Sequence, residues 1–180
     1  PFTYTLTMPI LVELTAAGYV ESGIPETTPL GNLIIRDDLT ASGAALTYVS
    51  NNAYLLHSDN TTTPLGALNV NTPDNKVLEF SYTTEPDLVL IPANTKLVIE
   101  LTVVLDNSPA NTPGTQFINT AEWEFSKAID LNEDGSIDPA TEIFEPIPGQ
   151  SGVTEPLTIA GPNLVVNKSG SETAVNLGVN

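Results

Sequence analysis

A short acidic segment in the last third of the chain has the ligand spacing of a calcium-binding loop. An EF-hand-type loop holds the cation with oxygen ligands at positions 1, 3, 5 and 9 and the backbone carbonyl of position 7, and a glycine at position 6 makes the sharp turn. The candidate ligands at this spacing, with Glu142 one place after the usual final ligand, are Asp130, Asn132, Asp134, Ser136, Asp138 and Glu142. Crowded carboxylates repel one another unless a cation neutralises them, so the spacing favours calcium. The alternative is a surface turn rich in Asn, Asp and Gly.

Three polar residues lie in phase with the apolar side chains of their own strand-like segments. They are Asp37 in Leu33–Leu39, Asn119 in Phe117–Phe125 and Lys168 in Leu164–Lys168. A one-residue slip would expose the apolar set instead, so the phase directs these three side chains inward. A buried charge is costly unless it is paired and hydrogen-bonded. If the three strands are neighbours, we therefore expect the three side chains to meet.

Such a cluster could form a covalent bond between side chains. A lysine amine surrounded by apolar groups loses its proton more easily and becomes a nucleophile. A buried carboxylic acid that stays protonated can polarise a carboxamide and relay protons. Attack of Lys168 on Asn119, assisted by Asp37, would release ammonia and leave an isopeptide bond. Two other interpretations remain: a buried Lys–Asp ion pair with Asn119 hydrogen-bonded beside it, or a Lys168 that extends to solvent from the end of its strand.

The residues needed for common enzymatic sites are scarce. His57 is the only histidine and there is no cysteine, which disfavours zinc triads and Ser-His-Asp or Cys nucleophiles. We therefore predict that the protein is not an enzyme and that His57 is a surface loop residue. The alternative function is a carbohydrate-binding module, whose platform would need exposed aromatic rings. Trp123 has the inward phase of a core residue, which leaves Tyr19, Tyr54 and Phe144 as candidates.

A period of two runs through most of the chain and predicts the strands that must position these residues. Apolar and polar residues alternate in Phe2–Met8 and again in Leu97–Leu105, which is typical of half-buried strands. Shorter strands are predicted at 33–39, 45–49, 76–82, 142–147 and 164–168. Segment 10–20 has a weak helical spacing, and we expect it to continue the first strand or to form one loose turn.

These elements predict an all-β fold, an immunoglobulin-like antiparallel β-sandwich with long inserted loops. Such a sandwich needs only about 100 residues, whereas this chain has 180. We expect the insertions at 19–32, 50–75 and 128–160. The predicted division is a sandwich over 1–162 and a carboxyl-terminal strand over 163–180.

The two ends of the chain resemble parts of one repeat. In order along such a repeat, the residues that carry the resemblance are Leu164 to Lys168, Tyr4 to Thr7, Asp37 to Leu39 with Leu46 to Val49, and Asn119 to Ala121. This pattern resembles the "conserved repeat" family of bacterial and archaeal surface proteins, immunoglobulin-like units strung in tandem. The usual proline after Asp-x-Leu is replaced by Thr40. The family includes members with Lys–Asn isopeptide bonds, so the resemblance implies Lys168 as nucleophile, Asn119 as acceptor and Asp37 as assisting acid.

The opening strand of the repeat stands at the carboxyl end of this chain, so the order is permuted. Segment 163–180 could complete its own sandwich or fill the open edge of the next unit by donor-strand complementation. In the second case, a bond through Lys168 would join neighbouring units of a fibre.

Composition points to the outside of the cell. A net charge of −17, with five basic residues, makes nucleic acid an improbable partner, and no apolar run reaches the roughly 20 residues of a membrane span. Abundant Thr, Asn and Pro favour an exposed surface protein. We expect a structural or adhesive unit of an extracellular filament, with calcium as cofactor. The expected partners are homotypic neighbouring units and, in an adhesive role, surface glycans or proteins.

Overall fold

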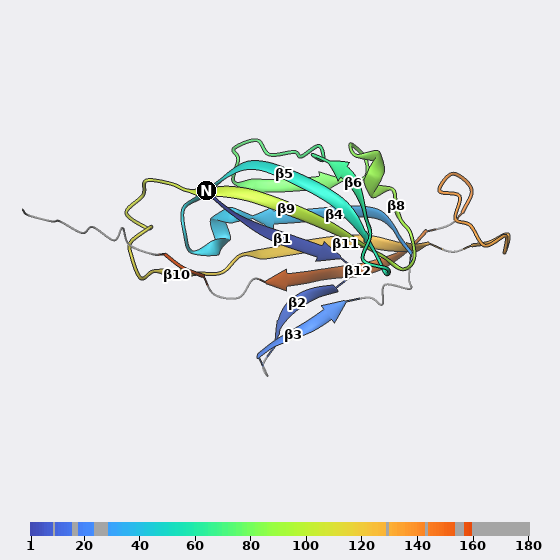
Figure 1. Ribbon diagram of the computed structural model, residues 1–180, viewed down its shortest axis with the longest axis horizontal. Helices are drawn as coiled ribbons and strands as arrows, with labels where there is room; N and C mark the ends of the chain where they lie inside the picture. The colour runs from blue at the N-terminus through green and yellow to red at the C-terminus, as the bar shows by residue number, and fades with distance from the viewer. Residues whose placement is uncertain are drawn as a thin grey trace, which may run out of the picture.

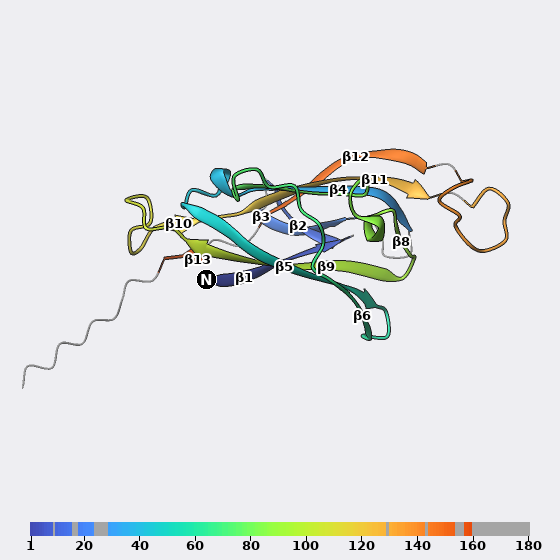
Figure 2. The ribbon, with the colours of Figure 1, turned by 90° about the horizontal axis from the view of Figure 1, so that it is seen from above.

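Two antiparallel β-sheets face one another across one apolar interior (Figure 1). The computed structural model describes residues 1–8, 10–15, 18–23, 29–128, 130–142, 144–153 and 157–159. Seen from above, β5 and β9 lie in one layer and β4, β11 and β12 in the other (Figure 2). This arrangement confirms the predicted all-β, immunoglobulin-like sandwich. Within the described residues, the helical elements are short 3-10 turns, and none is long and apolar enough to cross a membrane.

The first sheet has the strand order β1-β9-β5-β6. Its strands are β1 (Phe2–Met8), β9 (Thr95–Leu105), β5 (Leu46–His57) and β6 (Thr62–Gly66). β1 pairs with β9 from Phe2↔Val103 to Met8↔Leu97, and in the described part of the chain it has no ladder partner on its other side. β1 is therefore an edge strand.

The second sheet has the order β12-β11-β4-β7, with β8 also paired to β4. Its strands are β12 (Phe144–Val153), β11 (Thr120–Ala128), β4 (Leu30–Asp38), β7 (Val77–Ser81) and β8 (Leu90–Ile91). β11 is central and pairs with both β4 and β12. β12 contains Pro146 and Pro148, which edge strands tolerate because one side of the strand makes no ladder hydrogen bonds.

Smaller elements lie around the sandwich. β2 (Ile10–Thr15) and β3 (Gly18–Gly23) form a hairpin next to β12, and β10 (Gln116–Phe117) pairs with β13 (Leu157–Thr158). The 3-10 turn η1 (Leu39–Ser42) follows β4, and the 3-10 turn η2 (Pro86–Leu88) precedes β8. Asp38 caps η1 by accepting hydrogen bonds from the backbone N–H and the hydroxyl of Thr40, and Gly43, at φ 87°, ends it in the left-handed region.

The core is built from the inward positions of both sheets. Its largest fully buried side chains are Trp123, Phe80, Met8, Leu30, Leu33, Ile35, Leu39, Leu46, Leu78, Leu88, Ile91 and Leu97. Trp123 packs on Phe125 with ring centroids 4.8 Å apart, which confirms that Trp123 is a core residue. Many of these side chains come from alternate positions of the strands, so the period of two in the sequence reflects which side chains are buried.

Several expected boundaries were wrong. Residues 10–15 and 18–20 belong to the β2–β3 hairpin, a two-stranded sheet of its own, and neither continue β1 nor form one loose turn; the predicted strand at 117–125 is divided between β10 and β11. All three predicted insertions also contain ladder strands, and residues 19–32 hold most of β3 and the start of β4. Residues 50–75 hold the second half of β5 and all of β6, and residues 128–160 hold β12 and β13. Segment 163–180 lies outside the described residues, so its assignment stays a prediction.

Candidate functional site

The interior of the sandwich contains one acidic side chain that the β4 register turns inward. Asp37 and Asp38 are neighbours in sequence, yet Asp37 is 0% exposed whereas Asp38 is exposed and caps η1. Successive side chains of a strand point to opposite faces. The phase of β4 alone therefore gives two identical residue types opposite environments.

Asn119 reaches the same place from the neighbouring strand. It lies in the two-residue break between β10 and β11 and is 3% exposed. The next inward position, Ala121, pairs directly with Asp37. The amide Nδ2 of Asn119 donates a hydrogen bond to Asp37 Oδ1 at 2.8 Å. The structure thus brings together two of the three residues of the predicted cluster.

Tyr4 completes this buried cluster from the opposite sheet. Its hydroxyl donates a short hydrogen bond to Asp37 Oδ2, so the contact crosses from β1 to β4. The ring packs beside Phe2, with centroids 6.5 Å apart, and Phe2 in turn packs on Phe117 at 5.9 Å. Each oxygen of the Asp37 carboxylate is therefore held by a different donor. We call Tyr4, Asp37 and Asn119 the core triad.

Burial controls the acidity of the core triad. Desolvation raises the pKa of Asp37 to about 6, against the opposing effect of the hydrogen bonds from Tyr4 and Asn119. Burial and the nearby Asp37 charge also raise the pKa of Tyr4 far above its usual range. An acid in this range can be neutral or ionised near physiological pH, which is the property that a proton relay needs.

The third member of the predicted cluster is not placed. Lys168 lies outside the described residues, so neither the isopeptide bond, the ion pair nor the extended lysine is tested. A hydrogen-bonded pair of carboxyl and carboxamide in an apolar interior is compatible with the first two interpretations. In this pair, the amide group of Asn119 lies beside the carboxyl group of Asp37, which can donate a proton when it is neutral.

The acidic loop is held by hydrogen bonds within the loop itself. Asp130 Oδ2 accepts from the backbone N–H of Gly135 at 2.8 Å, and Gly135 adopts φ 84° to make the turn. Asp130 Oδ1 is buried and has no hydrogen-bond donor among the described residues. The backbone and hydroxyl of Ser136 donate to Asp134 at 2.9 and 2.6 Å, and the hydroxyl contact is the main reason that the pKa of Asp134 is lowered.

Glu142 ties the two ends of this loop together. It is 7% exposed, and its carboxylate accepts from the backbone N–H groups of Leu131 and Asp138 at 3.0 and 2.9 Å. In the described ranges, no three acidic, histidine or cysteine side chains are gathered closely enough to hold a metal ion. Asn132, Asp134, Ser136 and Asp138 are exposed, so they would have to turn inward to bind one. The calcium site stays a prediction.

Comparisons with known proteins assign no family. No family model matches the chain, and no curated protein matches it. A solved structure that matches is the crystal structure of ACE19, the collagen-binding subdomain of the Enterococcus faecalis surface protein ACE. It has a TM-score of 0.43 and 11% sequence identity, over 85% of this chain and 95% of that one. At this distance, the comparison assigns neither ligand nor partner to this chain.

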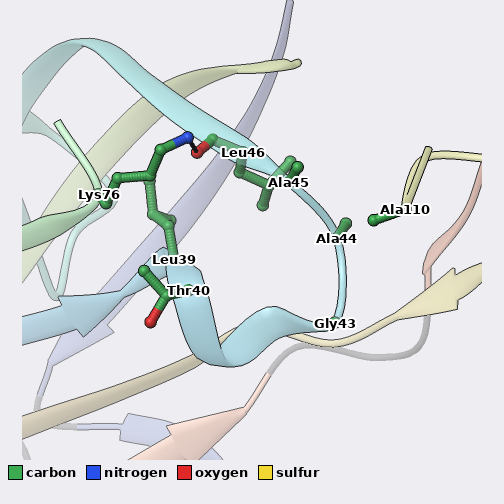
Figure 3. A pocket seen from close by; sticks show the side chains of 8 residues that line it. All are labelled: Leu39, Thr40, Gly43, Ala44, Ala45, Leu46, Lys76 and Ala110. Atoms are coloured by element: carbon green, nitrogen blue, oxygen red, sulfur yellow. Dashed lines mark hydrogen bonds between the residues drawn. The ribbon is translucent and has the colours of Figure 1, made fainter. Parts of the chain in front are cut away.

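A hollow of about 420 Å³ opens between η1 and the start of β5 (Figure 3). Its wall consists of Leu39, Thr40, Gly43, Ala44, Ala45, Leu46, Lys76 and Ala110. The Lys76 amine is already engaged by the Leu46 carbonyl, the Thr47 hydroxyl and the Asp106 carboxylate at 2.5, 2.8 and 2.5 Å. The hydrogen bonds that Asp106 accepts, first from Lys76 and then from Thr47, lower the pKa of Asp106. The amine of Lys76 is therefore hydrogen-bonded and ion-paired and is not a free nucleophile.

The remaining candidates do not converge on a site. His57 ends β5, where its Nε2 lies 2.8 Å from the hydroxyl of Thr63 across the β5–β6 pair, so it is a strand residue rather than a loop residue. Tyr54 lies partly exposed on β5, while the side chains of Tyr19 and Phe144 lie outside the described part. Tyr4 is the member of the core triad that the sequence did not predict. Its signal was a hydroxyl on an inward position, where phenylalanine would otherwise serve.

Proposed function

We propose that this chain is a structural unit of an extracellular surface fibre, stiffened by an internal or intersubunit amide bond at the core triad. The observation that carries the proposal is the hydrogen-bonded pair of Asp37 and Asn119, both buried between the two sheets. A buried carboxyl of raised pKa is costly in a domain that only needs to fold. Beside the carboxamide of Asn119, the carboxyl group of Asp37 could transfer protons while that amide is exchanged.

The proposed reaction balances without a cofactor. The neutral amine of Lys168 forms a bond to Cγ of Asn119 and loses one proton, while the bond from Cγ to Nδ2 breaks. The departing nitrogen gains that proton and leaves as ammonia. Asp37 relays the proton by giving one to the departing nitrogen and taking one from the attacking nitrogen. The products are an amide cross-link and free ammonia.

Intact mass spectrometry of the purified chain tests this reaction. We expect the mass to fall short of the sequence mass by one ammonia, and a single branched peptide joining Lys168 to Asn119 after proteolysis. Lys168→Arg should restore the full mass because arginine keeps the charge but is not a nucleophile at this pH. Lys127→Arg, on the exposed face of β11, is the matched control and should keep the loss. A wild-type chain at full mass would leave only the ion pair or the extended lysine.

Among the described residues β1 has no partner strand on its outer side, which supports the donated strand. An unpaired edge is a template for another strand, and the apolar segment Leu164–Lys168 has the alternation to fill it. Donation between units predicts that a chain lacking 163–180 becomes monomeric, whereas the full chain forms multimers in light scattering. If the shortened chain assembles as well as the full one, the strand serves only its own domain and donation is ruled out.

Calcium binding by the loop 130–142 is the second part of the proposal. It is supported by the ligand spacing and by the buried Asp130 oxygen that lacks a hydrogen-bond donor. Calcium should raise the melting temperature and excess EDTA should lower it, because a ligand that binds only the folded state stabilises it. Asp130→Asn should remove the response. Asp74→Asn, which changes a carboxylate that caps a turn elsewhere, should keep it. An identical melt with calcium and with EDTA would contradict the site.

A further inference from the structure

The hydroxyl of Tyr4 has a geometry that goes beyond filling space in the core. It donates to Asp37 Oδ2, while the Asn119 amide nitrogen donates to Asp37 Oδ1. One donor comes from the first sheet and the other from the second. A carboxyl group held at only one oxygen could rotate about its χ2 bond, because such terminal torsions are broad. Held at both oxygens, it is fixed in one plane.

We infer that Tyr4 is a positioning residue for amide-bond formation, which holds the Asp37 carboxyl so that one oxygen stays on the departing nitrogen of Asn119. This inference rests on the proposed function. Proton transfer needs donor and acceptor within hydrogen-bond reach in the reacting geometry. The Oδ1 contact meets that requirement at 2.8 Å, and the Tyr4 bond to the other oxygen preserves it.

The surroundings of Tyr4 support a fixed role for its ring. Phe2 packs against it on the same face of β1, and Phe117 backs Phe2 from the strand that precedes Asn119. The neighbours Thr3 and Thr5 are exposed on the opposite face. The aromatic contacts therefore aim the hydroxyl at Asp37 and link its position to the segment that carries Asn119.

A Tyr4→Phe chain separates positioning from folding. The chain is taken unfolded and uncross-linked from inclusion bodies, refolded over a range of pH, and sampled by intact mass for the rate of ammonia loss. Near pH 5, about one unit below the pKa of Asp37, the acid is mostly protonated in both chains. A rate difference there reports position and not acidity. We expect the rate to fall about tenfold or more, since small misplacements at a reacting centre are costly.

The pH profile of the rate of ammonia loss also tests the positioning role, because a residue with a merely structural role would not shift it. The described titratable groups that act on Asp37 are Tyr4 and Asp38, and the Tyr4 bond lowers the pKa of Asp37. Loss of that bond should move the inflection that belongs to Asp37 upward by about one pH unit. The inflection that belongs to the lysine should not move.

The control is Tyr48→Phe. Tyr48 is also a partly buried tyrosine, and its hydroxyl accepts a hydrogen bond from Asn51 at 2.8 Å, away from Asp37. It should lower stability without changing the rate near pH 5 or either inflection. If Tyr4→Phe behaves like Tyr48→Phe while the wild type forms its bond, the positioning role is wrong and the proposed function stands. If the wild type loses no ammonia at any pH, both are wrong.

Discussion

Replacement of Lys168 by arginine should lower the free energy of unfolding by about 4 kcal/mol, the entropic value of a cross-link that closes a loop of about 50 residues. The loop runs from Asn119 to Lys168. The cross-link restricts the unfolded chain, so its loss acts on the unfolded state more than on the folded one. For a chain of this size, the melting temperature should fall by about 10 °C. The measurement is reversible urea unfolding and calorimetry of both chains.

The Lys127→Arg control should unfold like the wild type. Because arginine keeps the charge, a drop in stability for Lys168→Arg without any mass difference from the wild type, beyond that of the substitution, would assign the loss to side-chain geometry and packing and not to an amide bond. An unchanged stability would show that no bond specific to lysine stabilises the folded domain. This assignment holds for a bond within one chain; a bond between units would appear as a loss of covalent multimers.

The second large effect is a fall in stability as pH rises from about 4 to about 6. Asp37 has a pKa of about 6 in the folded chain and an ordinary, lower value in the unfolded chain. The folded state therefore binds more protons over this range, and its stability is greatest below the unfolded pKa and is lost as pH rises through 6. The shift corresponds to about 2–3 kcal/mol. Urea unfolding near pH 4.5 and near pH 7 measures it.

The sign of this dependence separates the interpretations of the cluster. An ion pair of Lys168 with Asp37 would hold the carboxyl ionised and make stability increase with pH over the same range. The double variant Asp37→Asn with Lys168→Arg is compared with Lys168→Arg alone, so that no amide bond forms in either chain. Replacement of Asp37 should remove the dependence of stability on pH. Carboxyls such as Asp106, whose pKa is lowered by Lys76, act in the opposite direction, but mainly below about pH 4.

Strand phase carried much of what the sequence could predict. Alternation located β1 and β9 almost to the residue, and it directed Asp37 and Asn119 inward, where they are found in contact. Tyr4 had the inward phase as well, but the phase of one strand does not show which side chain it meets across the sandwich. That pairing depends on how the two sheets face one another, which no local pattern encodes.

The sequence failed to predict strands in which the polarity of a residue does not indicate whether its side chain is buried. Asn51 lies in β5 beyond a bulge at Tyr48/Ser50, and its amide is buried because it exchanges hydrogen bonds with the backbone of Leu68 at 3.0 and 2.8 Å. A run of Ser and Asn therefore resembled a loop. β12 was displaced for another reason: its prolines argue against a central strand, and only its place at the sheet edge permits them.

The order of the chain around the core triad has a mechanical consequence. β11, the loop 130–142 and β12 all lie between Asn119 and Lys168 in the sequence (Figure 2). With an amide joining those two residues, tension applied to the ends of the chain would pass directly from one to the other. The whole intervening stretch would become an unloaded side branch. The acidic loop could then bind or release its ligand without feeling the pull on the fibre.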